Sequence, residues 1–315
     1  MKHLGLTALG LYSLAGSANL LQQGPPTWHP GALQCTPETT RTEARSIDTD
    51  VIMLRQNPCV DSEANLVYVL VGARRVLLID TGAVEGAAAA ALVEWVQLAR
   101  RAELARRDEK EGDGPLPLLV VHTHGHQDHR AGDAAFAALP GTEIIAAPTG
   151  TLDLGDREVV VIPAPGHHPD HVVFYDGQSR SLFTGDFLLR GRLLVDDLDA
   201  YRESAQRVAD FVKTHPVENV LGAHIELDIT GKPFPAGATF HPNERTRPLT
   251  IFDVYALPAA LSDFNGFYST YPNFIVVNPI HNLIAVATGA IAAIVLLVWL
   301  TRRLLKRRRA ARVTD

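Results

Sequence analysis

The sequence has 315 residues but only two cysteines, Cys35 and Cys59. The chain can therefore form at most one internal disulfide, which excludes a small fold held together by several of them. In an oxidising compartment this disulfide would tie the N-terminal extension to the rest of the protein, and two free thiols are the alternative. Neither cysteine falls in the motifs that carry the chemistry.

Basic residues are scarce in most of the chain. Residues 301–315 hold seven of the 29 lysines and arginines and one of the 35 acidic residues. The first 300 residues therefore contain 22 basic and 34 acidic residues, a net charge of −12. A protein that processes RNA needs a basic face to hold phosphates, so the composition argues against a nucleic-acid partner.

The middle of the chain alternates between strand-like and helix-like segments, without an internal repeat. Short apolar runs bounded by turn residues predict strands, and longer segments with helical spacing predict helices. The second predicted helix begins at Asp199 as its cap. The strands are expected at 51–54, 66–71, 76–79, 116–121, 143–147, 159–162, 171–175 and 181–184, and the helices at 84–107 and 199–215.

The run H-G-H-Q-D-H at 124–129 directly follows a strand-like stretch. Alternate side chains of a strand share a face, so His124 and His126 can point at one metal ion. In the turn that follows, Asp128 and His129 can reach a second ion. Imidazole and carboxylate groups suit zinc, iron and other first-row ions, so this run predicts a metal site.

One further motif precedes this run and three follow it. They are L-L-I-D-T-G at 77–82, then P-A-P-G-H-H-P-D-H at 163–171, S-L-F-T-G-D at 181–186 and N-V-L-G-A-H at 219–224. Together the five segments resemble the signature motifs of the metallo-beta-lactamase superfamily. The resemblance covers residues 45–230. It implies an α/β fold, the four-layer αββα sandwich, with which the alternating segments are compatible.

The resemblance also implies a role for each motif residue. The first metal would be bound by His124, His126 and His167, the second by Asp128, His129 and His224, and Asp186 would bridge the two. Asp80 would orient the metal-binding loop through hydrogen bonds without binding metal itself. His122, His168 and His171 are interpreted as packing or hydrogen-bonding residues. The cofactor would be two zinc ions per chain, with iron or a mixed pair as alternatives.

Two cations about 3.5–4 Å apart would generate a bridging hydroxide and polarise a substrate carbonyl. Asp128 could orient that hydroxide and carry a proton to the leaving group. The expected activity is hydrolysis of a small-molecule lactone, thioester or related ester. Within the superfamily, enzymes that cleave β-lactams generally have Cys or Ser at the position of Asp186, so a β-lactamase is the second reading. A persulfide dioxygenase with one iron is the third.

The end of the chain is apolar and then basic. Residues 283–300 contain no charged side chain, and with 274–280 they are long enough to form one transmembrane helix, predicted at 274–300. The seven basic residues after Leu300 predict a cytoplasmic tail at 301–315 that contacts lipid headgroups. Residues 231–273, rich in proline, glycine and aromatics, would form either a cover over the metal site or a membrane-proximal spacer.

The N-terminus has the layout of a secretory signal, with Lys2 before the apolar run 4–15 and small residues after it. Residues 1–18 would form this signal or an uncleaved anchor, and residues 19–44 an extension. Both readings place the catalytic domain outside the cytoplasm, in the periplasm of a Gram-negative cell, on a single-pass membrane protein. The sequence does not define an oligomeric state.

Overall fold

The computed structural model describes residues 28–36, 42–106 and 115–311. The predicted signal or anchor at 1–18 lies outside the described residues, as do residues 19–27 of the expected extension.

Six strands form the first sheet, in the order β1-β2-β3-β4-β5-β6. Neighbours from β1 to β4 are antiparallel, whereas β4, β5 and β6 run parallel. Every residue of β3 and β4 is buried, because both faces of this sheet are covered. The strands are β1 (Glu43–Asp48), β2 (Val51–Arg55), β3 (Leu66–Val71), β4 (Val76–Ile79), β5 (Leu118–Val121) and β6 (Thr142–Ile145).

Five strands form the second sheet, in the order β12-β10-β9-β8-β7, with β10 and β12 parallel and the other neighbours antiparallel. Its inner face packs on the first sheet, for example where the rings of Tyr68 and Phe183 lie 4.9 Å apart. The strands are β7 (Thr151–Asp153), β8 (Glu158–Pro163), β9 (Val172–Asp176), β10 (Ser181–Gly185) and β12 (Asn219–Gly222).

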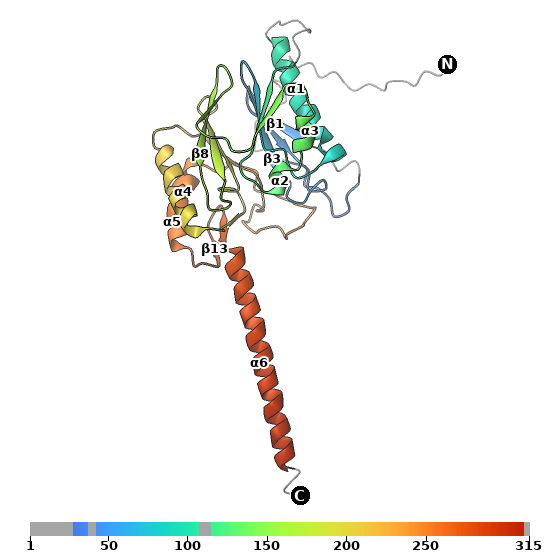
Figure 1. Cartoon of the computed structure of the whole chain (residues 1–315), viewed down its shortest axis with the longest axis vertical. Helices are drawn as coiled ribbons and strands as arrows, with labels where there is room; N and C mark the ends of the chain where they lie inside the picture. Colours follow the sequence, from blue (N-terminus) through green and yellow to red (C-terminus); the bar gives the residue numbers. More distant parts are fainter. Residues whose placement is uncertain (1–27, 37–41, 107–114, 312–315) are drawn as a thin grey trace, which may run out of the picture.

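Helices cover the outer faces of both sheets (Figure 1). Leu92 and Val96 of α1 and Phe136 of α3 pack on the first sheet, while Tyr201 and Val208 of α4 pack on the second. The result is the predicted four-layer αββα sandwich. The helices are the 3-10 turn η3 (Gly86–Ala89), α1 (Ala90–Arg106), α2 (Gln127–Arg130), α3 (Asp133–Ala137), α4 (Leu198–Phe211) and α5 (Ile251–Asp263).

A third, small sheet leads into the last helix. Its order is β11-β14-β13, formed by β11 (Arg192–Leu194), β13 (Tyr268–Thr270) and β14 (Ile275–Val277). Helix α6 (Pro279–Ala311) follows β14 directly and projects from the domain (Figure 1). Its segment Pro279–Leu304 is long and apolar enough to cross a membrane, and none of it is buried.

Three sequence-based boundaries differ from the structure. The apolar residues 274–278 were expected to begin the transmembrane region, but Phe274 is buried and Ile275–Val277 forms β14, so the candidate span begins at Pro279. The end of α6 at Ala311 also places most of the basic tail within the helix. The helix expected from Asp199 is capped by Asp197 instead, whose Oδ1 accepts a hydrogen bond from the Ala200 amide.

Part of the segment 231–273, expected to form a cover or a membrane-proximal spacer, is built into the folded domain as α5 and β13. Helix α5 packs beside α4 in the outer layer, where Val254, Leu257 and Leu261 are buried. The folded domain therefore begins before residue 45 and continues beyond residue 230, through α5 and the small sheet.

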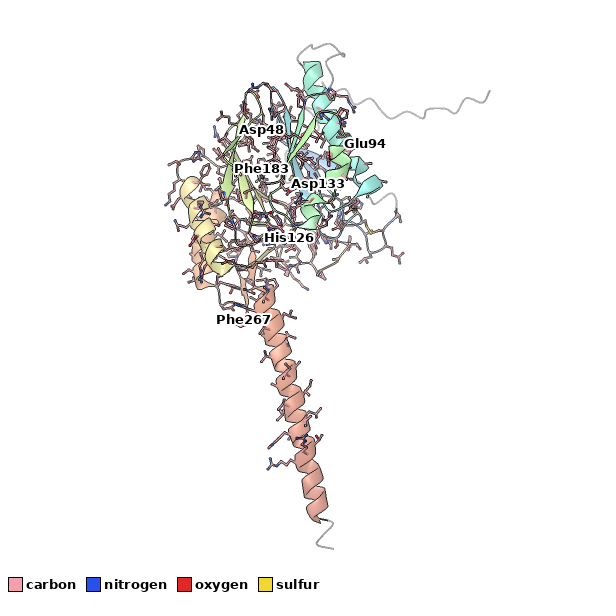
Figure 2. The ribbon with its side chains drawn as sticks, in the orientation of Figure 1. Asp48, Glu94, His126, Asp133, Phe183 and Phe267 are labelled. Atoms are coloured by element: carbon pink, nitrogen blue, oxygen red, sulfur yellow. A yellow bond between two sulfur atoms is a disulfide. The ribbon has the colours of Figure 1, made fainter. Side chains whose placement is uncertain are left out.

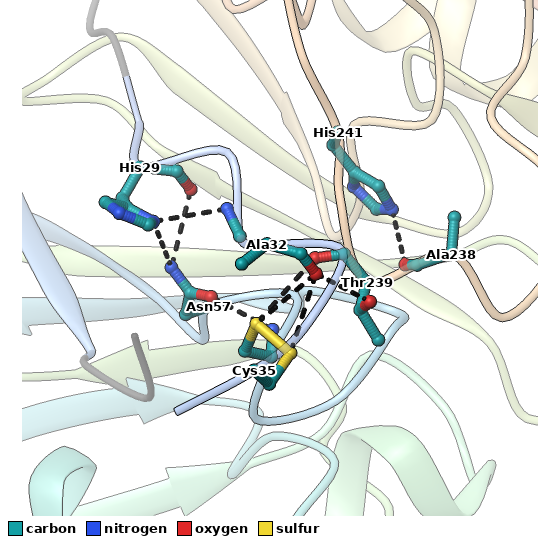
Figure 3. The surroundings of a disulfide bond; sticks show 9 residues. His29, Ala32, Cys35, Asn57, Ala238, Thr239 and His241 are labelled. Carbon is teal, nitrogen blue, oxygen red and sulfur yellow. Dashed lines mark hydrogen bonds between the residues drawn. A yellow bond between two sulfur atoms is a disulfide. The ribbon is translucent and has the colours of Figure 1, made fainter. Parts of the chain in front are cut away.

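Cys35 and Cys59 form a disulfide, one of the two states that the sequence allowed. Figure 3 shows that it joins the N-terminal segment to the loop after β2, next to Thr239. Asn57 Nδ2 lies 3.1 Å from His29 Nδ1, and the Ala32 amide donates to the Thr239 carbonyl. The N-terminal segment is thereby held against two loops that are distant in sequence.

Candidate metal centre

The candidate ligands follow the carboxyl ends of strands, in loops or in the short helix α2. Because β4 and β5 are parallel in one sheet and β10 and β12 in the other, these ends gather at one edge of the sandwich. The ligand segments follow β5 (His124 and His126 in the loop, Asp128 and His129 in α2), β8 (His167), β10 (Asp186) and β12 (His224).

The first group consists of His124, His126 and His167, whose ligand atoms all lie within 4.8 Å of one another. His126 Nδ1 is 2.9 Å from His124 Nε2 and 3.1 Å from His167 Nε2. A single Nδ1 offers one proton or one lone pair, so it cannot form a full hydrogen bond to both neighbours. A cation between the three nitrogens would account for their convergence.

The second group consists of Asp128, His129, Asp186 and His224, again within 4.8 Å of one another. Asp128 Oδ2 lies 3.2 Å from His129 Nε2 and 3.5 Å from His224 Nε2. The group combines two imidazoles and two carboxylates, a mixed donor set that suits a first-row divalent ion.

Asp186 faces both groups. Its Oδ2 lies 3.5 Å from His167 Nε2, while its Oδ1 lies 3.2 Å from His224 Nε2 and 3.6 Å from His129 Nε2. The backbone amide of Asp186 donates to Nε2 of the buried His171. The carboxylate of Asp186 therefore lies between the two groups.

Asp80 fixes His129. Its Oδ2 lies 2.8 Å from His129 Nδ1, and its Oδ1 accepts a hydrogen bond from the Thr123 amide at 2.8 Å. Asp80 has the left-handed φ of 64°, which aspartate tolerates better than most residues. With its Nδ1 proton directed at Asp80, His129 presents Nε2 to the second group.

Two backbone carbonyls orient the other histidines. His167 Nδ1 donates to the Leu194 carbonyl at 3.0 Å, and His224 Nδ1 donates to the Glu63 carbonyl at 2.8 Å. A carbonyl only accepts, so each Nδ1 carries the proton and each Nε2 is left for a ligand bond. Neither partner could be found from sequence, because a carbonyl is present at every position.

Gly166 allows the loop that carries His167 to pack closely against α4. It has a φ of 137°, and a Cβ at this position would lie 2.4 Å from Tyr201 Cα in α4. Its carbonyl accepts hydrogen bonds from the amides of Asp196 and Asp197, just before that helix. The loop therefore rests directly on the first turn of α4.

The residues present fit a metal pair. His129 Nε2 and Asp186 Oδ1 are buried, and neither has a partner at hydrogen-bonding geometry among the described residues. Leaving buried polar atoms without a hydrogen-bond partner costs free energy. A metal ion bound between these two atoms would supply the missing partner.

A sequence model of the metallo-beta-lactamase superfamily matches residues 61–151 and 144–224, together more than half of the chain. The chain belongs to this superfamily. The superfamily fold implies metal ions, commonly zinc, and the two groups described above are the candidate site.

Similar proteins support a hydrolase of this superfamily. An acyl-coenzyme A thioesterase of Gallus gallus is 26% identical over 165 residues, which cover 37% of this chain and 60% of that protein. A hydroxyacylglutathione hydrolase of Cereibacter sphaeroides is 28% identical over 159 residues, covering 45% and 59%. The chain thus spans about 60% of the length of these relatives.

The fold has a solved counterpart. A metallo-beta-lactamase from Pontibacter korlensis superposes with a TM-score of 0.50, covering 71% of this chain and 100% of that one. The two sequences are 18% identical, so this likeness concerns the fold.

The two ligand groups of this superfamily member differ in electrostatics. Burial strongly lowers the pKa of His124, and neighbouring imidazoles lower it further, so it is neutral. Burial also lowers the pKa of His129 and of His224, but Asp186 and the other nearby carboxylates outweigh it and raise both values. Without metal, protons on these two imidazoles neutralise the carboxylates where an ion would otherwise do so.

Three neighbouring histidines belong to neither group. His122 Nε2 lies 3.1 Å from Asp133 Oδ1, His168 contacts Asp170, and His171 accepts the Asp186 amide. His168 and His171 thus make polar contacts, whereas His122 is buried and neither of its ring nitrogens has a partner at hydrogen-bonding geometry among the described residues.

Proposed function

We propose that this superfamily member is a dinuclear zinc hydrolase of carboxylic esters, with thioesters as the preferred class. The observation that carries the proposal is the position of Asp186, with one carboxylate oxygen toward each ligand group. His124, His126 and His167 would bind the first ion, Asp128, His129 and His224 the second, and Asp186 both. When bound, two such cations lower the pKa of a shared water and polarise a carbonyl oxygen.

Asp128 is the proposed proton carrier. In the metal-free protein, burial raises the pKa of Asp128, but contacts with His129 and His224 outweigh burial and lower it, so the carboxyl is ionised. Asn65 Nδ2 donates to the Asp128 carbonyl at 3.0 Å and lies 3.5 Å from its Oδ2, which restricts the side chain. Asp128 would accept a proton from the attacking water and deliver it to the leaving thiolate.

A carboxylate at position 186 favours thioesters over β-lactams, because superfamily enzymes that cleave β-lactams generally have Cys or Ser there. The relatives named as an acyl-coenzyme A thioesterase and a hydroxyacylglutathione hydrolase support the same class. β-Lactam hydrolysis is therefore the second candidate, and persulfide oxidation at a single iron the third.

Helix α6 is the proposed membrane anchor. The segment Pro279–Leu304 has 26 residues, about 39 Å of helix, which exceeds the ~30 Å hydrocarbon core of a bilayer. The basic residues at its end, beginning with Arg302 and Arg303, would hold the C-terminus in the cytoplasm and contact anionic lipid. The catalytic domain would then lie outside the cytoplasm.

Metal analysis of the full-length protein in detergent, paired with a substrate panel, tests the function. We expect about two zinc ions per chain and hydrolysis of an acyl thioester, with less activity on a lactone and least on a β-lactam. One iron per chain with oxygen consumption on a persulfide would replace the proposal with the dioxygenase. Cleavage of the β-lactam alone would replace it with the second candidate.

A further inference from the structure

The metal centre lies at the same edge of the domain from which α6 departs. β11 and β14 are parallel, so both end at this edge, where Leu194 pairs with Val277. The Leu194 carbonyl accepts from His167, and α6 begins two residues after Val277. In Figure 2, His126 and Phe267 both lie in the part of the domain nearest α6, whereas Asp48 lies at the opposite end.

These contacts place the site close to the end of the candidate span. One hydrogen bond of 3.0 Å, one strand spacing and two residues of extended chain separate His167 from Pro279, on the order of 15 Å in all. A 26-residue helix of about 39 Å is nearly as long as a whole bilayer with its headgroups, so Pro279 would lie at headgroup level.

The junction between domain and helix is held on two sides. Asn278 alone separates β14 from α6, and its Oδ1 accepts the His281 amide in the first turn. Across from it, the carbonyls of Gly266 and Phe267 contact His281 Nδ1 at 2.8 Å and accept from Asn282 Nδ2 at 3.0 Å. These contacts restrain the orientation of the domain relative to α6, and with α6 as an anchor the edge that carries the candidate metal centre would face the membrane.

An apolar row crosses the small sheet between the site and the helix. Leu194, Val277 and Tyr268 are direct cross-strand partners and so share one face. Leu194 and Tyr268 are 37% and 45% exposed, and Phe267 beside them is 46% exposed. The opposite face, with Leu193 and Val276, is fully buried in the domain. Exposed aromatic residues next to a span are typical of the membrane interface.

We propose that this row, Leu194–Val277–Tyr268 with Phe267, guides an acyl chain from the bilayer to the metal centre. The substrate class is then a long-chain acyl thioester that resides in the membrane, with its thiol portion in water. The row lies along this path of about 15 Å between the start of α6 and His167, so it could cover the part of the acyl chain that leaves the bilayer. The inference rests on the proposed thioester hydrolysis and on α6 as an anchor.

The test uses the full chain reconstituted into phosphatidylcholine vesicles, with butanoyl and hexadecanoyl thioesters of the same thiol. We expect kcat/KM for the hexadecanoyl thioester to exceed that for the butanoyl one by about tenfold or more, because apolar contact favours the longer chain. Tyr268→Glu should remove most of this preference and leave butanoyl hydrolysis unchanged, while Tyr268→Phe should keep it.

Phe252→Glu is the matched control. Phe252 is 77% exposed in the first turn of α5, whose other end leads to β13, about 20 Å of helix away. It should leave both activities unchanged. An equal loss of the preference in the Phe252 variant, or its survival in Tyr268→Glu, would overturn the acyl path.

Surface dilution provides a readout that needs no variant. Adding phosphatidylcholine at fixed amounts of enzyme and hexadecanoyl thioester should lower the rate in proportion to the substrate's share of the bilayer. A rate that depends only on bulk concentration would overturn the inference while leaving thioester hydrolysis intact. Failure to cleave either thioester would refute the proposed function, and failure of the protein to float with vesicles would refute the anchor; each would end the inference as well.

Discussion

Arg55 of β2 and Glu244, 189 positions later, form an ion pair in which both side chains are buried, 2% and 3% exposed. The guanidinium of Arg55 lies 5.8 Å from the ring centroid of Trp28, in the N-terminal segment. Burial lowers the pKa of Arg55, and Glu244 and Glu43 oppose this effect. The pair links the first sheet, the N-terminal segment and the loop between β12 and α5.

Glu244→Gln should strongly destabilise the protein. The change leaves the Arg55 charge buried without its counter-ion, which costs about 3–5 kcal/mol in the free energy of unfolding. Urea denaturation of the metal-free protein measures it. The exposed pair Arg180–Glu218 provides the control, because Glu218→Gln should cost less than about 1 kcal/mol. Similar losses in both variants would contradict the importance assigned to burial.

Asp80→Asn should weaken metal binding about 10–100-fold, the usual effect of removing a hydrogen-bond partner of a metal-binding histidine. Asparagine also tolerates the left-handed backbone of this residue, so the fold should be retained. Competition with a chelator measures the affinity. Wild-type affinity in this variant would show that Asp80 does not orient His129.

His126 and His168, whose rings lie 4.7 Å apart, should respond differently to replacement. His126→Ala should abolish turnover and lose metal with the fold retained, because the sandwich core does not include this side chain. His168→Ala should retain substantial activity, since His168 contacts Asp170 and belongs to neither group. Equal loss of metal in both variants would refute the assignment of His167 as the ligand.

The gain in stability on zinc binding should rise with pH. In the metal-free protein, carboxylates raise the pKa of His129 and His224 despite their burial. Protonation therefore stabilises the metal-free fold below the usual histidine pKa, and this contribution is lost as pH rises through the raised values. Zinc must displace these protons, so the difference in unfolding midpoint with and without chelator should grow from about pH 6 to pH 9. A constant difference would contradict it.

Protease treatment tests the orientation in the membrane. In sealed right-side-out vesicles, added protease should digest the catalytic domain and spare an epitope placed after Asp315, because basic residues after a span stay in the cytoplasm. Protection of the domain with loss of the epitope would reverse the orientation and direct the search toward cytoplasmic thioesters.

The sequence predicted those elements whose signal is local. Strands β3 and β4 were expected with the bounds observed, since their apolar runs end at a clear turn, 72–75. The candidate ligands were expected because each follows a strand end in a motif. The helical cap was misplaced by two residues, because Asp197 and Asp199 are equally good acceptors in isolation.

Long-range packing accounts for what the sequence did not reveal. The apolar strand β14 was assigned to the transmembrane region because hydropathy does not distinguish burial in protein from burial in lipid. The place of helix α5 beside α4 depends on contacts between residues far apart in the chain. The carbonyls of Glu63 and Leu194 have no side-chain signal at all.

Gly166 limits how this active site could be redesigned. Any other residue there would place a Cβ 2.4 Å from Tyr201 Cα, so the loop that carries His167 fits only against this helix in this position. Grafting the loop onto another scaffold would require transferring the start of α4 with it. Conversely, a helix that replaced α4 would have to keep its backbone in the same place beside Gly166, or the loop that carries the candidate ligand His167 would have to shift.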